Sequence, residues 1–202
     1  VAVRNPAPGG MMSVGVAESE PAAQFTFMDT ITWDSTPEDV ELVLGDDVQR
    51  GEETDESIGT VAVLWTENES FAGYECGRMM FTYYNDKLCF IACYYTQTDV
   101  GDVALLIDGL TQIYGAPHMY ESDETTLDDL ISGTKQMCGW DIWDDTEIGV
   151  VHLKSDDTHS IFPQQKVDSP YLCVASFVNI PVFNQLQEAV GAWADKSGEP
   201  EK

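Results

Sequence analysis

The chemistry that this chain could carry depends first on its five cysteines and three histidines. None of the cysteines stands in a C-x-x-C pair and no H-E-x-x-H occurs, so their spacing gives no support for a zinc site. A serine or cysteine nucleophile needs a neighbouring base, and the sequence has no G-x-S-x-G elbow. Glycine-rich phosphate-binding loops are absent as well. We therefore expect no catalytic residue, no metal ligand and no cofactor.

The thiols pose a separate question, because an odd number of cysteines leaves at least one unpaired in the monomer. If Cys89 and Cys93 share a strand, four residues at about 3.3 Å each separate them by ~13 Å, which is too far for a mutual disulfide. We interpret the cysteines as small buried hydrophobic residues, with disulfides among the others as the alternative. The five are Cys76, Cys89, Cys93, Cys138 and Cys173.

Acidic residues dominate the charge of the chain. Its 36 acids and 9 basic residues give a net charge of −27, which argues against binding to nucleic acid. Asp34 to Glu56 holds ten acids against Arg50 alone, and Glu121 to Asp129 holds five acids and no base. We interpret these runs as solvated loops and faces, since neither fits the spaced calcium-binding loop. With so many acids, a hydrolase that uses two carboxylates remains an alternative.

The first part of the domain predicts a short helix followed by strands. Thr36 can cap a helix that begins at Pro37, with Asp39 completing a capping box and Gly45 ending the helix. We expect residues 46–56 to form an acidic loop and 58–66 to form a strand.

A β-hairpin is predicted next, over 77–84 and 87–95, because Asn85 and Asp86 suit a tight turn. An unbroken ladder from that turn places Phe81 opposite Phe90 on the core side. It places Tyr84 and Tyr95 on the opposite, mixed face.

The second part repeats this order. A helix is predicted over 99–114, with Gly115 and Pro117 as stop signals, followed by an acidic connection over 119–133. A hairpin over 137–143 and 147–154, a strand over 171–178 and a helix over 182–194 follow. The whole predicts an α+β fold, an antiparallel sheet with helices packed on one face. Two helix-plus-three-strand units, 25–97 and 98–180, are consistent with a duplication.

Several short strings resemble a loose group of secreted bacterial lipoproteins that share the architecture of β-lactamase-inhibitor proteins and of small lipoproteins of outer-membrane assembly. The strings span Ile31 to Val40 with Leu44-Gly45, Asp86 to Leu88, Ile113 to Pro117, and Trp140 to Ile148. The resemblance runs from about Phe25 to Phe177 and implies helical segments packed on an antiparallel sheet. It also implies an exported, non-enzymatic protein that acts by binding. No contact residue of the inhibitors matches here.

The two ends predict flexible segments around one domain. Residues 1–24 are rich in Pro, Gly, Ala, Ser and Glu, which is typical of a tether left after removal of a signal or lipid anchor, and a cloning choice gives the same pattern. We expect a single domain over 25–196 and a polar tail over 197–202. No apolar run approaches the ~20 residues that cross a bilayer. These features predict an extracellular or cell-surface location.

Aromatic side chains are the candidate binding residues. We expect Trp33, Trp65 and Trp193 to pack in the core. Tyr84, Tyr95 and Trp143 are predicted to lie on the mixed face or at a turn, where they could anchor an interface. The sequence therefore predicts an exported binding or accessory protein whose partner is a protein or a cell-envelope component. A structural subunit of a surface assembly is the further alternative.

Overall fold

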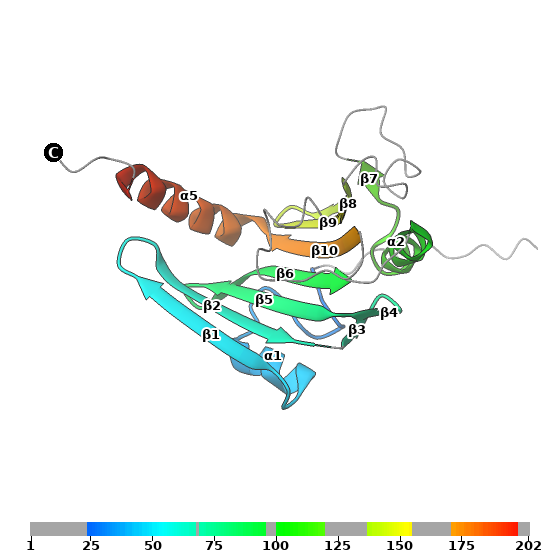
Figure 1. Ribbon diagram of the computed structural model, residues 1–202, viewed down its shortest axis with the longest axis horizontal. Helices are drawn as coiled ribbons and strands as arrows, with labels where there is room; N and C mark the ends of the chain where they lie inside the picture. The colour runs from blue at the N-terminus through cyan, green and yellow to red at the C-terminus, as the bar shows by residue number, and fades with distance from the viewer. Residues whose placement is uncertain (1–23, 68, 96–99, 120–136, 155–170, 198–202) are drawn as a thin grey trace, which may run out of the picture.

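One antiparallel sheet of eight strands forms the body of the protein, in the order β1-β2-β5-β6-β10-β9-β8-β7 (Figure 1). The computed structural model describes residues 24–67, 69–95, 100–119, 137–154 and 171–197. With the helices beside it, the sheet confirms the predicted α+β class. Its strands are β1 (Gln49–Asp55), β2 (Gly59–Thr66), β5 (Arg78–Tyr84), β6 (Lys87–Tyr95), β7 (His118–Met119), β8 (Met137–Trp143), β9 (Thr146–Lys154) and β10 (Tyr171–Asn179). A separate hairpin joins β3 (Glu69–Phe71) to β4 (Tyr74–Cys76).

The strand order divides the sheet into two halves with the same connectivity. Each half begins with a helix and continues as an antiparallel meander, and the last strands of the two halves, β6 and β10, meet at the centre. Each half contributes four strands to the sheet, whereas the sequence predicted three. The added strands are the outermost ones, β1 and β7.

The prediction of an acidic loop over 46–56 is therefore wrong, because most of this segment forms strand β1. This strand pairs with β2 along its whole length, from Gln49 opposite Trp65 to Asp55 opposite Gly59. Its side chains are mostly exposed, so no apolar alternation marks it in the sequence. Charged side chains on an edge strand discourage pairing with the edge of another molecule, which accounts for this composition.

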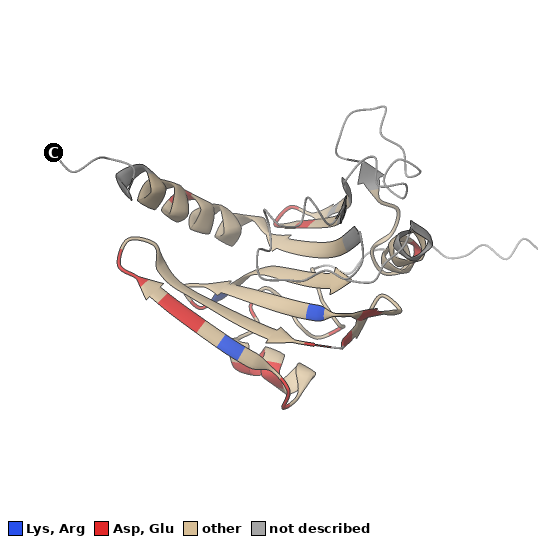
Figure 2. Cartoon of the chain, viewed as in Figure 1, with Lys and Arg blue, Asp and Glu red and all other residues tan. Residues whose placement is uncertain are grey.

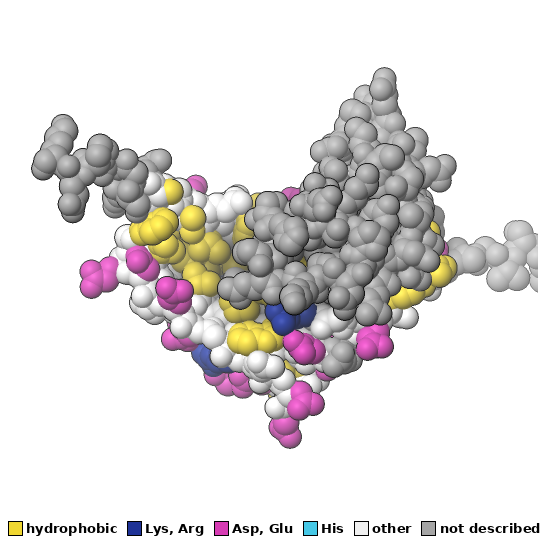
Figure 3. Space-filling model, in the orientation of Figure 1, with side chains coloured by type: hydrophobic (Ala, Val, Ile, Leu, Met, Phe, Trp, Pro, Cys, Tyr) yellow, Lys and Arg dark blue, Asp and Glu magenta, His cyan; other side chains and the backbone are white. Residues whose placement is uncertain are grey.

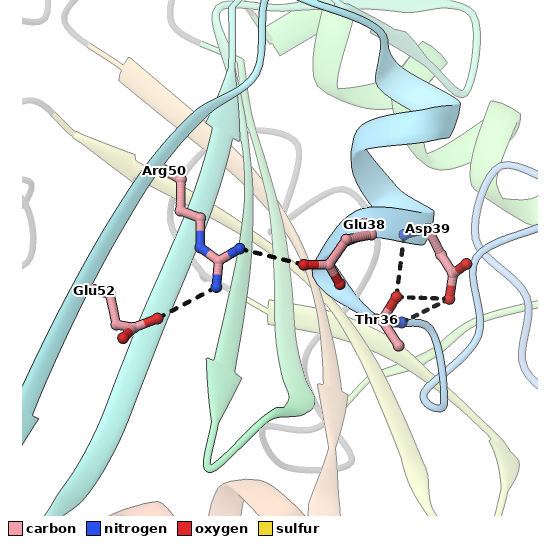
Figure 4. A network of polar contacts seen from close by, with 5 residues as sticks. All are labelled: Thr36, Glu38, Asp39, Arg50 and Glu52. Atoms are coloured by element: carbon pink, nitrogen blue, oxygen red, sulfur yellow. Dashed lines mark hydrogen bonds and ion pairs between the residues drawn. The ribbon is translucent and has the colours of Figure 1, made fainter.

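Both helices of the two halves end at a glycine, as predicted. Helix α1 (Pro37–Leu44) has a full capping box between Thr36 and Asp39 (Figure 4). It ends at Gly45, with φ 87°, and α2 (Val100–Tyr114) is followed by Gly115, with φ 84°. Only glycine takes such positive φ angles at little cost, and in each case its N–H bonds back to the last helical turn.

The hydrophobic core lies on one face of the sheet, between the strands, α1, α2 and the segment 25–31. Phe27 stacks on Phe71 with ring centroids 4.4 Å apart and meets Phe177 edge-on at 5.1 Å. Leu106 and Leu110 of α2 and Val40 of α1 are fully buried against this cluster. Residues 25–31 therefore belong to the hydrophobic core.

The central hairpin has the predicted turn but a different register. Asn85 and Asp86 both take positive φ, 47° and 65°. Tyr83 lies opposite Leu88, but Phe81 lies opposite Ile91 and not Phe90, because a β-bulge at Cys89 adds a residue to β6. A one-residue shift turns every later side chain of β6 to the other face. The expectation that Tyr95 shares the mixed face with Tyr84 is therefore wrong.

The last helix, α5 (Ile180–Ser197), is longer than predicted and packs differently from the other two. Val182 and Leu186 contact Tyr84 and Cys89 on the face of the sheet that α1 and α2 leave uncovered. Beyond this contact the helix extends past the sheet (Figure 1). Two helices thus cover the core face, and α5 lies at one end of the opposite face.

Candidate binding surface

Two of the predicted binding aromatics, Tyr84 and Tyr95, are buried. Tyr84 is 8% exposed, and its hydroxyl donates a hydrogen bond to the carbonyl of Ile58 at 2.8 Å. Tyr95 is 2% exposed and donates to the carbonyl of Phe71 at 3.2 Å. Burial raises the pKa of Tyr95, because water no longer solvates the phenolate. Both side chains therefore tie neighbouring loops to the sheet.

The third predicted residue, Trp143, is half-buried at the end of β8. Its ring packs edge-on against Phe25 at 5.7 Å and against Tyr114 at 6.2 Å. Trp33 stacks on Phe25 at 4.5 Å and donates its indole N–H to Thr146 Oγ1 at 2.7 Å, as its predicted packing role requires. The structure does not bring Tyr84, Tyr95 and Trp143 together into one site.

A different set of apolar side chains gathers on the face opposite the core, here called the outer face. Register assigns it Val61, Val63 and Trp65 of β2, Met80 of β5 and Phe90 of β6, all of them half-buried. Trp65 lies across the edge strand, where a Cβ at Gly51 would stand 3.4 Å from Trp65 Cζ3. Because Gly51 has no side chain, the indole ring of Trp65 can pack closely against the backbone of the edge strand.

Helix α5 continues this apolar surface. Its residues Phe183, Leu186, Val190 and Trp193 recur at helical spacing and form a single line, here called the α5 stripe. Phe183 stacks on Phe90 at 5.8 Å, so the stripe starts on the outer face. Val190 and Trp193, further along, are each 43% exposed. Hydrophobic side chains accordingly gather along α5 and the adjoining sheet (Figure 3).

Acidic residues border this apolar surface. Glu53 and Asp55 of the neighbouring edge strand β1 lie opposite Val61 and Gly59 and share the outer face, and red segments follow that strand in Figure 2. Hydrogen bonds from the side chain and backbone of Ser57 lower the pKa of Asp55, which holds it as a carboxylate.

The arginines that the structure describes are already paired with acids. Arg50 contacts Glu38 at 3.6 Å and Glu52 at 3.3 Å (Figure 4), and Arg78 contacts Glu67 at 3.0 Å. These contacts are largely exposed, so each adds little stability, but they leave the surrounding field negative.

A cleft of about 610 Å³ opens on another side, between α2, the β3–β4 turn and the turn at Met28 and Asp29. Its walls are tight turns, in which Asp29 and Ala72 have φ 64° and 54°. Among the described residues that line it, Asp29 is the one acid. An acid-pair hydrolase needs two carboxyls at a set separation, so this cleft does not supply them.

Within the part of the chain that the structure describes, no group of three or more histidine, cysteine or acidic residues is arranged to hold a metal ion. None of the helices in this part combines the length and the apolar character needed to cross a membrane.

Sequence reasoning missed the residues that form the outer surface. Trp65 and Trp193 were expected to pack in the core, but Trp65 lies on the outer face and Trp193 belongs to the α5 stripe. The helical period of that stripe is real, but a period does not say whether the apolar side of a helix is covered. The polar residues that follow Ala194 were the available signal that this end of the helix could be exposed.

Comparison with models of protein families, with curated proteins and with solved structures gives no match for this chain.

Proposed function

We propose that this protein is a non-enzymatic binding protein that docks a partner protein on the outer face and the α5 stripe. The main support is that Val190 and Trp193 are exposed at the far end of the α5 stripe, which starts on the sheet. Exposing apolar side chains to water costs roughly 25 cal/mol per Å², and contiguous exposed patches mark interaction sites. A rigid helix and a half-exposed tryptophan on a sheet are suitable anchors for an interface.

The charges indicate the kind of partner. An apolar centre beside Glu53 and Asp55 complements a protein surface on which an apolar patch is ringed by lysine and arginine. A net charge of −27 would also speed encounter with such a partner at low salt. Nucleic acid and anionic lipid carry the wrong sign.

The location of the binding activity rests on the resemblance to secreted bacterial lipoproteins. That resemblance favours export and attachment at the cell surface through a removed or lipid-modified leader. Labelling of intact producing cells with a reagent that does not cross membranes tests this part separately. If the protein is labelled only after lysis, the surface location is wrong and the binding proposal is unaffected.

A photo-reactive amino acid in place of Val190 tests the binding surface in producing cells. Leu42 of α1 is the matched control, because it is 85% exposed and belongs to the other side of the sheet. We expect a cross-linked protein from position 190 and not from position 42. The purified partner should then bind the protein with an affinity that falls at least tenfold in Val190→Glu, is unchanged in Leu42→Glu and weakens with salt. Equal cross-linking from both positions, or none from 190, would refute the proposal.

The same exposed surface favours one second candidate, a structural subunit that assembles with copies of itself. Sedimentation velocity over a range of protein concentrations distinguishes the two functions. A monomer that binds a different protein supports the docking proposal. Self-association that Val190→Glu abolishes and Leu42→Glu leaves unchanged would replace it with the structural role.

A further inference from the structure

The cleft beside α2 has the size of a site for a small molecule. Its volume of about 610 Å³ lies within the roughly 300 to 1,000 Å³ that is typical of ligand pockets. Three segments that are distant in sequence line it, namely residues 28–29, residues 70–73 and the last two turns of α2. Phe71 and Tyr114 of this lining belong to the main core. The cleft is therefore separate from the outer face and the α5 stripe.

The walls of the cleft are held in place by contacts within the protein. Phe27 precedes the first turn and stacks on Phe71 of β3 with ring centroids 4.4 Å apart. The hydroxyl of Tyr114 donates a hydrogen bond to the carbonyl of Thr26 at 3.3 Å, which joins α2 to the same N-terminal wall. Gly109 has no side chain and lets α2 pack directly on the β3–β4 turn. The cleft is therefore preformed, which favours affinity because a ligand does not have to order the walls.

The lining combines apolar side chains with a single charge. Phe71, Ala72 and Ile113 contribute apolar surface, and Ile113 is 51% exposed. Asp29 is the one charged side chain among the described lining residues, and it is exposed. Within the described part of the chain, no residue forms a hydrogen bond or ion pair with its carboxylate. Such a carboxylate, in a chain of net charge −27, attracts a cation and repels an anion.

We propose that this cleft binds a small organic cation, a primary amine joined to an apolar body such as an aromatic ring. The ammonium group lies at the carboxylate of Asp29, to which it donates a charge-assisted hydrogen bond. The apolar body lies against Ala72 and Ile113 and removes their surface from water. A neutral compound of the same shape makes only the second contact, and an anion is repelled. The inference is independent of the proposed docking surface.

Titration of the full chain with phenethylamine, followed by the amide signals in heteronuclear NMR, tests the site. Phenethyl alcohol and hydrocinnamate have a similar shape and serve as the neutral and the anionic comparison. We expect the amine to shift the signals of residues 28–29, 70–73 and 109–114 and to bind with a Kd of about 1 mM or below. It should bind about threefold more tightly than the alcohol, as for one exposed ion pair, and hydrocinnamate should bind most weakly.

Matched variants separate the two contacts. Asp29→Asn should lower the affinity for the amine to that for the alcohol and leave the alcohol unaffected. Asparagine tolerates the φ of 64° at this position, so the turn is kept. Asp86→Asn makes the same change at φ 65° in the turn of the central hairpin and should alter neither affinity. Ile113→Ala should weaken the amine and the alcohol alike, by about threefold, whereas Leu105→Ala, at a position of α2 that is 54% exposed and outside the cleft, should weaken neither.

Titration of the unaltered protein with the three probes decides the matter even if a variant fails to fold. Signal shifts confined to another surface, or equal affinity for the amine and the anion, would overturn the proposal. So would the absence of amine binding at millimolar concentration. A loss of amine binding in Asp86→Asn as large as that in Asp29→Asn would also overturn it, because the attraction would then come from net charge alone.

Discussion

Gly109 of α2 is the position where the smallest change should have the clearest effect. A Cβ built there would stand 2.4 Å from the carbonyl oxygen of Ala72, a backbone atom in the β3–β4 turn. Real Cβ atoms are essentially never closer than 3.0 Å, so the turn or the helix must move by more than half an ångström. Forcing such a shift in packed structure costs typically 1–3 kcal/mol. Alanine in a helix returns about 1 kcal/mol through its better helix propensity. Gly109→Ala should therefore be neutral to destabilising by about 2 kcal/mol.

Gly191 of α5 supplies the control, because no atom lies within 4 Å of a Cβ built there. Gly191→Ala should keep the helical gain without the clash and stabilise the protein by ~0.5 to 1 kcal/mol. Urea denaturation followed by tryptophan fluorescence measures both free energies of unfolding, and their difference isolates the steric cost. If Gly109→Ala stabilises the protein as much as Gly191→Ala does, the close packing of α2 against the β3–β4 turn is wrong.

Two further predictions test single hydrogen-bonding groups. Tyr84→Phe removes the donor to the Ile58 carbonyl and should cost about 1 kcal/mol in urea denaturation. Tyr83→Phe should be neutral or stabilising, because the buried Tyr83 hydroxyl has no hydrogen-bond partner among the residues that the structure describes. The reverse order of the two effects would contradict the assigned contacts. The pKa of Asp55 should lie below its usual 3.8 when followed by NMR, and Ser57→Ala should raise it. Since the folded-state pKa is lowered, this carboxylate's contribution to stability is complete above pH 4 or so and is lost as pH falls through the lowered value. A midpoint at or above 3.8 would contradict the Asp55–Ser57 contact.

Local signals predicted the parts of the fold that local chemistry determines. The Thr36 capping box, the helix stop at Gly45 and the Asn85-Asp86 turn each depend on a few adjacent residues, and the structure has all three. Strand β1 was missed because backbone hydrogen bonds hold this edge strand in the sheet, and they require no apolar alternation in its sequence. The bulge at Cys89 was missed because the residues on both sides of it are apolar. The sequence pattern therefore does not reveal that the later side chains point to the other face of the sheet.

The candidate surface was harder to predict for the same reason. Burial of Tyr95 depends on the bulge. The register predicted without the bulge placed this core residue on the mixed face, so it was taken for a binding residue. Exposure of Val190 depends on where the sheet ends beneath α5, which is a property of the whole fold. Periodicity finds an apolar side of a helix, and tertiary structure alone decides what that side meets.

The meeting of β6 and β10 at the centre of the sheet has a consequence for synthesis of the chain. Strand β6 is complete at Tyr95, but its neighbour, Tyr171–Asn179, is made only after α2, β7, β8 and β9. Until then the first half carries an open, largely apolar strand edge, which is a template for pairing with other chains. Closing it requires contacts between residues far apart in sequence, which form slowly. A chain that stops short of Tyr171 should therefore aggregate rather than fold as a half-sized domain.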